Sequence, residues 1–405
     1  MALILAAVGF VAVGSGPTLA ATTTTVGPWS QSNADAALSR SNPAESVLTA
    51  RTIARARYLR SVVAEPQDPN NEDDCTGGRF PVPPLLYGGA VYAMAGGWLT
   101  KTNASTGAVV WRVRQSSANF FEDLAVSSSG LVVLGSTNCI SQSDPGGSIE
   151  AFRAGTGARV WSVPGLPSDP MLDHFLLSSG YVVAIGEPAA ATPDVVVAVY
   201  KVATGEQVWS TVRRVSANCN AFGMRVLVAA GQVVYPSCIA KGSALVARDL
   251  ATGARTWTRA GAWQLGGANS DSPTAGHHLY AVDSAGNVQD LIPQSGRTRF
   301  TLAGATRYLA VDGRRVYGNC GTSDLCAYDQ ATGARLWVRP GRSTSLAASA
   351  GGVLYLADGS VLNAATGADI TTLWAGTATD LSVGNGHVAV VVEPRILDLY
   401  GLRGY

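Results

Sequence analysis

The sequence predicts an all-β fold built from one repeated four-stranded unit, and three observations carry this prediction. The chain of 405 residues contains 46 glycines and 9 tryptophans, while only 14% of its residues are charged. A Thr-Gly or Ser-Gly pair with an aromatic residue shortly after it recurs along most of the chain. Amphipathic patterns of helical length are nearly absent after residue 80. Short strands joined by tight turns explain all three, because glycine supplies the positive φ that hairpin turns need.

The repeat has a period of about 42 residues, which is the length of one propeller blade. Its clear copies place an aromatic residue after the glycine at Trp111, Trp161, Trp209, Trp257, Phe300 and Trp337. A seventh copy begins at Thr366-Gly367, and a decayed eighth copy over 399–404 ends the chain. The sequence therefore predicts an eight-bladed β-propeller of four-stranded antiparallel blades, with seven blades as the alternative.

The repeated aromatic residues are expected to dock neighbouring blades. Each one falls on the fourth, outermost strand of its unit, where a large ring fits between adjacent sheets. Burying such a ring stabilises the fold by roughly 2–3 kcal/mol. We therefore assign these six residues to packing rather than to ligand binding.

The eighth unit lacks a fourth strand, which would leave an exposed sheet edge. Residues 56–64 look like an outer strand with no Thr-Gly turn ahead of it, and we predict that they complete this blade. Residues 44–55 are predicted to form a short helix before it. The resulting organisation is a signal peptide over 1–21, a lead-in over 22–80 and a propeller over 81–405.

The start of the chain predicts export. Leu3 to Gly14 is an uncharged apolar run, and small residues follow it up to Ala21. This pattern resembles a signal peptide, and the run is too short to cross a bilayer, which needs about 18 residues. We expect a secreted or cell-envelope protein with no stable membrane span. Whether the segment is cleaved or stays as an anchor is left open.

Six cysteines support export, because an even number in a secreted chain indicates disulfides. Six cysteines allow fifteen pairings. The positions of the cysteines within the repeat units reduce this number. Cys320 and Cys326 flank the middle hairpin of the sixth unit. The remaining expected pairs are Cys219–Cys238, on adjacent strands of the fourth unit, and Cys75–Cys139, between the lead-in and the second unit. Each is expected to stabilise the fold by about 2–4 kcal/mol.

Charge and motifs exclude several functions. The formal net charge is +1 and the charged residues are scattered along the chain, so we expect no nucleic-acid partner. The sequence has no Gly-x-Ser-x-Gly, His-Glu-x-x-His or P-loop pattern. His277 and His278 are adjacent in a predicted strand and therefore point to opposite faces. We assign no catalytic and no metal-binding residue.

One group of polar residues precedes the first strand of several units. In a propeller the innermost strands surround a central channel, and their leading ends open at one face. Convergent polar groups at such a mouth are a candidate ligand site, although Asn and Asp also favour turns. The candidate residues are Glu122, Asp123, Asp173, His174, Asn218, Asp271, Arg307, Arg342 and Asp380.

The repeats resemble the pyrroloquinoline-quinone (PQQ)-type β-propeller superfamily, whose units end in an Ala-x-Thr-Gly-x-x-x-Trp docking motif. The lead-in, with Trp29 and residues 41–49, is similar to the tryptophan-led segment before the first blade of exported members. The resemblance implies the fold. Dehydrogenases of this superfamily hold PQQ over a disulfide between adjacent cysteines, beside a Ca²⁺ and an Asp base. This sequence has no adjacent cysteine pair and no Cys-x-x-Cys-His motif.

The sequence therefore favours an exported, non-enzymatic and monomeric scaffold without a cofactor. It would bind a protein, a saccharide or another small ligand through its loops and channel mouth. The alternative is a quinoprotein oxidoreductase that depends on PQQ and Ca²⁺.

Overall fold

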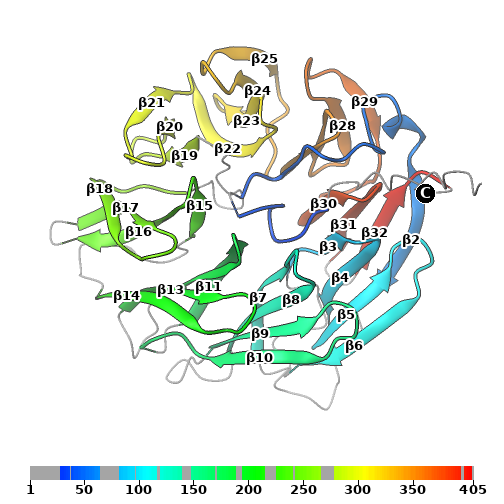
Figure 1. Cartoon of the computed structure of the whole chain (residues 1–405). Helices are drawn as coiled ribbons and strands as arrows, with labels where there is room; N and C mark the ends of the chain where they lie inside the picture. The colour runs from blue at the N-terminus through cyan, green and yellow to red at the C-terminus, as the bar shows by residue number, and fades with distance from the viewer. Residues whose placement is uncertain are drawn as a thin grey trace, which may run out of the picture.

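Eight antiparallel sheets surround a central axis in the computed structural model (Figure 1). The structure describes residues 28–36, 38–63, 82–95, 97–115, 119–138, 147–168, 171–187, 194–214, 225–239, 242–265, 278–393 and 396–403. Within each blade, strands that follow one another in the chain are neighbours in the sheet. The predicted eight-bladed propeller is confirmed, and the seven-bladed alternative is not.

The first four blades each contain four strands. Blade 1 consists of β3 (Leu85–Tyr87), β4 (Ala90–Ala95), β5 (Trp98–Asn103) and β6 (Val109–Arg114). Blade 2 consists of β7 (Asn119–Val126), β8 (Leu131–Asn138), β9 (Gly147–Arg153) and β10 (Arg159–Pro164). Blade 3 consists of β11 (Met171–Ser178), β12 (Tyr181–Glu187), β13 (Asp194–Lys201) and β14 (Gln207–Arg214). Blade 4 consists of β15 (Leu227–Ala229), β16 (Gln232–Ile239), β17 (Gly242–Asp249) and β18 (Arg255–Ala260).

The last four blades differ in their strand content. Blade 5 has β19 (Leu279–Val282), β20 (Val288–Leu291) and β21 (Thr298–Thr301), and Gln264 bridges to its inner edge. Blade 6 consists of β22 (Ala305–Val311), β23 (Arg315–Cys320), β24 (Asp324–Asp329) and β25 (Arg335–Arg339). Blade 7 consists of β26 (Ala347–Ala350), β27 (Val353–Leu356), β28 (Ser360–Asn363) and β29 (Asp369–Thr372), with β1 (Ser41–Asn42) added in parallel. Blade 8 consists of β30 (Asp380–Gly384), β31 (His387–Glu393), β32 (Ile396–Gly401) and β2 (Arg57–Val63).

The Thr-Gly pair forms the turn that leads into each outer strand, and blade 4 shows how. The Asp249 carboxylate accepts the backbone N–H and the hydroxyl of Thr252, both at 2.8 Å. These hydrogen bonds hold the pKa of Asp249 below its usual value. Gly253 then adopts a φ of +72°, which side chains disfavour. The repeat motif is therefore a turn with its own internal hydrogen bonds.

The repeat tryptophans join each blade to the next. In five cases the indole N–H donates to the carbonyl three residues before the turn glycine of the following blade. The pairs are Trp111 to Ala154 (3.0 Å), Trp161 to Val202 (2.9 Å), Trp209 to Leu250 (2.9 Å), Trp257 to Pro293 (2.7 Å) and Trp337 to Ala364 (3.2 Å). The rings lie against the turn glycines, so that a Cβ on Gly253 would come within 2.7 Å of the Trp209 ring. Glycine is needed at this position for both its φ and its lack of a side chain.

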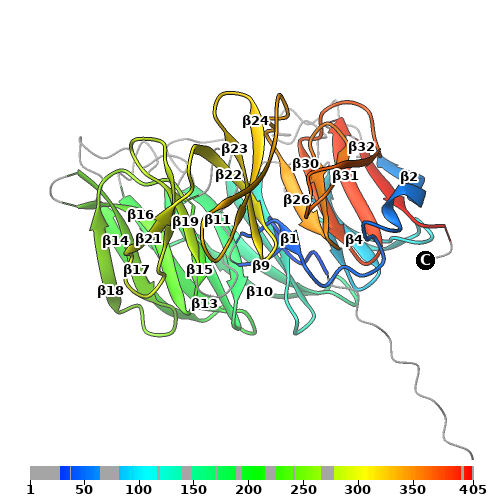
Figure 2. The same ribbon diagram turned by 90° about the horizontal axis from the view of Figure 1, so that it is seen from above.

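An N-terminal strand closes the ring, as the sequence predicts. Strand β2 pairs antiparallel with β32, from Arg57 opposite Gly401 to Val63 opposite Ile396. Figure 2 shows β2 at one edge of the ring, opposite β14 and β18 at the other. At the seam with blade 1 an arginine takes the place of the tryptophan, because the Arg60 guanidinium lies against Gly107 and donates to the Ser105 carbonyl.

Residues 28–42, which we term the channel segment, run through the middle of the ring (Figure 1). The segment forms hydrogen bonds with the first strands of blades 1 to 4 and 6 to 8. The contacts are Trp29 with Leu86, Ser30 with Val126, Gln31 with Leu177, Ala36 with Val228, Ser39 with Val311, Arg40 with Ser349 and Asn42 with Val383. The sequence did not predict this placement. The lead-in therefore both fills the channel and supplies the closing strand.

The predicted helix over 44–55 is reduced to one 3-10 turn, η1 (Ile53–Arg55). The Glu45 carboxylate is the physical reason. It accepts the backbone N–H groups of Val47 (2.7 Å) and Leu48 (3.0 Å), and also that of Gly386 in blade 8 (3.0 Å). These bonds hold the segment as a turn against the ring instead of a helix.

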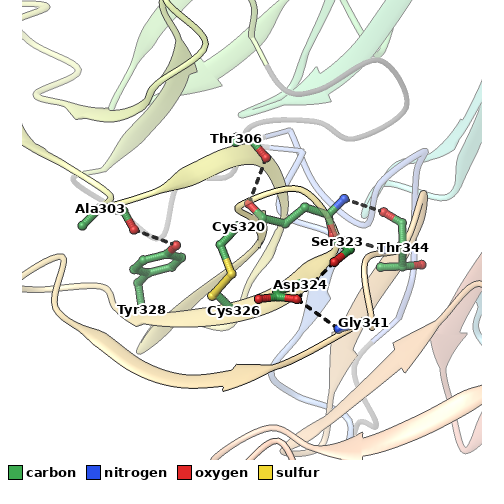
Figure 3. Close-up of a disulfide and its surroundings, with 10 residues drawn as sticks. Ala303, Thr306, Cys320, Ser323, Asp324, Cys326, Tyr328, Gly341 and Thr344 are labelled. Carbon is green, nitrogen blue, oxygen red and sulfur yellow. Dashed lines mark hydrogen bonds between the residues drawn. A yellow bond between two sulfur atoms is a disulfide. The ribbon is translucent and has the colours of Figure 1, made fainter.

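The predicted Cys320–Cys326 disulfide is present in blade 6 (Figure 3). It connects the end of β23 to β24, and the Asp324 carboxylate beside it accepts the Gly341 N–H at 3.0 Å. Residues 1–21, Cys75, Cys139, Cys219 and the Cys238 side chain lie outside the described residues, so the signal peptide and the other two disulfides stay predictions. In the described part of the chain, no helix has the length and apolar character needed to cross a membrane.

Candidate functional site: the central cavity

A cavity of about 550 Å³ lies at the centre of the propeller. The channel segment contributes Ser32, Asn33 and Arg40 to its lining, and the blades contribute further charged and hydroxyl side chains. Among these are Asp123, Asp173, His174, Arg225 and Asp380. Cavities of this size hold small molecules. Carboxylate, guanidinium, imidazole and hydroxyl groups therefore line one shared cavity.

Two β-bulges shape the cavity wall formed by blades 2 and 3. The pairing of β7 with β8 shifts between Phe121 and Asp123, and that of β11 with β12 shifts between Leu172 and His174. Successive residues in a regular strand point to opposite faces, whereas a bulge redirects them. This explains how the consecutive residues Asp173 and His174 both line the cavity.

A buried hydrogen bond between an imidazole and a carboxyl group connects these two blades. His174 Nδ1 lies 2.5 Å from Asp123 Oδ2, and the side chains are 4% and 6% exposed. The same oxygen accepts the Phe175 backbone N–H at 3.0 Å. Because the carboxylate only accepts, the proton between the two groups is on Nδ1. Asp123 thereby fixes both the imidazole orientation and the position of β11 against blade 2.

Gly135 permits this close approach of blades 2 and 3. It pairs with Asp123 across the β7–β8 ladder. A Cβ built on Gly135 would lie 2.7 Å from a Leu172 methyl group and 2.8 Å from the Phe175 ring. A larger residue here would force the Leu172 and Phe175 side chains of β11 to shift. The position of His174 therefore depends on a glycine in the neighbouring blade.

The channel segment is held firmly where it meets the cavity. The Gln31 side chain accepts the Leu177 N–H (2.8 Å) and donates to the Leu177 carbonyl (3.2 Å). Asp35 accepts both the N–H and the hydroxyl of Ser39, at 3.0 and 2.6 Å. The Arg40 N–H donates to the Asn33 carbonyl at 2.9 Å, which closes the loop that carries Arg40. These bonds place Arg40 in the cavity wall.

The structure brings together four of the nine candidate residues from the sequence, namely Asp123, Asp173, His174 and Asp380. Arg307 is beside the cavity, where it donates to the carbonyl of the lining residue Ser345 at 3.3 Å, and burial lowers its pKa. Arg342 is not part of the lining.

Arg342 instead forms ion pairs with Asp358 (3.3 Å) and with Asp369 on the outer strand of blade 7 (2.9 Å). The Glu122 side chain, Asn218 and Asp271 lie outside the described residues. Sequence reasoning missed Ser32, Asn33 and Arg40, because no local motif indicates that the lead-in enters the channel. It also missed Arg225, which lies just before β15 of blade 4.

Within the described ranges, no cluster of three His, Cys, Asp or Glu side chains is arranged to hold a metal ion. A second histidine with a carboxylate partner, His278, lies in blade 5. Its Nδ1 is 2.7 Å from Asp290, which also pairs with Arg299 at 2.9 Å. His278 does not line the cavity, and its contacts are those of a structural residue.

Comparison with known proteins shows what the chain resembles. Residues 145–307 match the family model described as outer membrane protein assembly factor BamB. No curated protein sequence matches the chain. BamB from Moraxella catarrhalis aligns with a TM-score of 0.59 and 19% identity, over 85% of this chain and 99% of that chain.

Two further solved structures have similar scores. Quinohemoprotein alcohol dehydrogenase from Comamonas testosteroni aligns with a TM-score of 0.62 and 12% identity, over 93% of this chain and 81% of that chain. The computationally designed Ika8 protein aligns with a TM-score of 0.58 and 15% identity, over 80% and 100%. An assembly factor, an enzyme and a designed protein thus share this architecture, so the likeness shows the fold alone.

Proposed function

We propose that this member of the PQQ-like β-propeller superfamily is a non-enzymatic binding scaffold of the cell envelope or extracellular space. Its loops would contact a partner protein, and its central cavity would hold a small polar ligand or a polar segment of that partner. The observation that carries the proposal is the central cavity, whose lining contains charged groups from the channel segment and from blades 2, 3, 4 and 8.

The chemistry of the cavity supports binding rather than turnover. Its lining contains groups of both charge signs together with hydroxyls, so it suits a ligand with several hydrogen-bonding groups. His174 is the side chain among them best suited to accept a proton. Its contact with Asp123, however, serves to connect blades 2 and 3. The family description of an assembly factor, matched over part of the chain, supports the scaffold role.

The residues of the cavity do not fit the quinone cofactor of the alternative function. Dehydrogenases of this superfamily hold PQQ over a disulfide, yet the described lining contains no cysteine, and it contains no Phe, Tyr or Trp ring that could cover a planar quinone. No described trio of acidic or histidine side chains is placed for Ca²⁺. We therefore derive no reaction step through PQQ.

The proposal is tested by partner capture with cavity variants. The wild-type protein, the double variant Asp173→Asn/Asp380→Asn and the control Arg342→Ser are used to recover partners from an envelope and extracellular extract. We expect the wild type and the control to recover the same partner and the double variant to lose it. Electron transfer from alcohols or sugars to a dye, after incubation with PQQ and Ca²⁺, would overturn the scaffold role. Equal recovery by all three proteins would exclude the cavity.

A further inference from the structure

Basic side chains gather on the outer strands of the propeller. Strands β2, β6, β10, β14, β18, β21, β25 and β29 occupy the periphery of the ring (Figure 1). Together they carry twelve arginines and a single acidic residue, Asp369. We term this surface the arginine rim. Its arginines whose side chains the structure describes are Arg57, Arg60, Arg112, Arg114, Arg159, Arg213, Arg255, Arg259, Arg299, Arg335 and Arg339.

The opposite charge lies nearer to the axis. In the three inner strands of the blades, acidic residues outnumber basic ones, and Asp123, Asp290 and Asp380 are examples. The whole chain has a formal net charge of only +1. Among the described strands, charge is therefore separated radially, with an excess of positive charge on the outer strands. Charged residues that look scattered in the sequence form one surface in space.

Some arginines of the rim already form ion pairs with carboxylates of the protein itself. Arg159 pairs with Glu150 at 2.9 Å, and Arg339 pairs with Asp369. In contrast, Arg213, Arg255 and Arg335 are exposed and have no carboxylate partner among the described residues. These three arginines come from blades 3, 4 and 6, so the available charge extends around a large part of the circumference.

Protection of sheet edges does not account for this pattern. Charged side chains on outer strands prevent edge-to-edge pairing, but acidic or mixed charges serve that purpose equally well. Seven of the eight outer strands contain no acidic residue. Arginine, moreover, presents a planar fork that binds phosphate and sulfate groups with two hydrogen bonds. The single sign of charge on these strands indicates recognition of anions.

We infer that the arginine rim binds a linear, flexible anionic polymer with phosphate or sulfate groups at regular intervals. The shape of the rim decides the kind of partner. A flat anionic membrane can touch only one or two blades of a ring at a time, and duplex DNA is stiff over about 50 nm. A flexible chain can follow the circumference from blade to blade. Binding of this kind is separate from the central cavity.

The test measures binding of inorganic polyphosphate to the full protein across a range of salt concentrations. A triple variant, Arg213→Ser/Arg255→Ser/Arg335→Ser, removes the arginines without carboxylate partners. The matched control, Arg51→Ser/Arg55→Ser/Arg314→Ser, removes three exposed arginines that are not on outer strands. Parallel measurements use heparin, duplex DNA and vesicles of anionic lipid. Polyphosphate carries phosphate groups and heparin carries sulfate groups, so comparing them shows which kind of polymer the rim binds.

We expect the rim variant to bind polyphosphate or heparin at least tenfold more weakly than the wild type, and the control to bind nearly normally. The slope of log K against log salt should fall by about 2, since each lost contact removes roughly 0.7. Equal losses in the two triple variants would overturn the inference, because net charge alone would then explain binding. Tighter binding to vesicles or duplex DNA than to both flexible polymers would also overturn it, and so would no polymer binding at 0.15 M salt.

Discussion

The contact between Trp209 and blade 4 offers a direct way to measure what docks one blade to the next. Replacing Trp209 with Phe keeps a ring against Gly253 but removes the indole N–H, which donates to the Leu250 carbonyl at 2.9 Å. One such hydrogen bond contributes about 0.5–1.5 kcal/mol net. Replacing Trp209 with Ala also removes the ring, which raises the expected loss to about 3–4 kcal/mol.

Blade 5 allows the opposite substitution, in which the missing indole N–H is added. Phe300 occupies the repeat position there and lies against Gly333, yet it has no N–H to donate. A Phe300→Trp variant should therefore gain about 1 kcal/mol by donating to the Gln330 carbonyl, three residues before that glycine. Phe300→Leu is the control that lacks both the ring and the donor. Urea denaturation followed by circular dichroism gives the free energies of unfolding.

Two results would refute this account of docking. One is a Trp209→Phe loss as large as that of Trp209→Ala, which would mean that the ring against the glycine contributes nothing. The other is a Phe300→Trp protein no more stable than the wild type, which would mean that the N–H bond is not a general part of the motif.

Three further outcomes follow from single sites. Burial lowers the pKa of His387, so the unfolded chain binds more protons than the folded protein as the pH falls below about 6.5. The melting temperature should therefore fall on acidification from pH 7.5 to 5.5. A His387→Gln variant whose melting temperature depends on pH as steeply as that of the wild type would contradict this. Gly135→Ala should cost about 1–3 kcal/mol by displacing the Leu172 and Phe175 side chains on either side of His174, seen as a lower denaturation midpoint and a shifted His174 NMR signal. An unmoved signal would count against the close-packing argument. Cys320→Ser/Cys326→Ser should lower stability by about 2 kcal/mol in a urea titration. Equal denaturation midpoints for this variant and the wild type would contradict that role.

The repeat could be predicted from the sequence because its chemistry is local. The Thr-Gly turn, its positive φ and the aromatic residue after it all lie within six positions, and each copy repeats them. Counting the copies predicts the number of blades. The missing fourth strand of the last copy predicts ring closure by residues 56–64, which the structure confirms as β2. The resemblance to the PQQ-type superfamily rests on the same local motif and is also confirmed.

The cavity was only partly predictable because its formation depends on contacts distant in sequence. Asp173 and His174 both reach it through a bulge that alternation in a strand does not foresee. Arg40 reaches it because the channel segment bonds to seven blades, from residues up to 341 positions away. The arginine rim was missed for the same reason, since strands far apart in the chain become neighbours only when the ring closes.

The central claim is that the cavity, with the channel segment in its wall, is where this propeller binds. Hydrogen–deuterium exchange on the full protein, with and without the partner recovered by the wild type, tests it most directly. The account predicts protection of residues 30–42, 171–178 and 377–384, with little change in the outer-strand turns. Protection confined to the outer strands, or no change in these three segments, would contradict it.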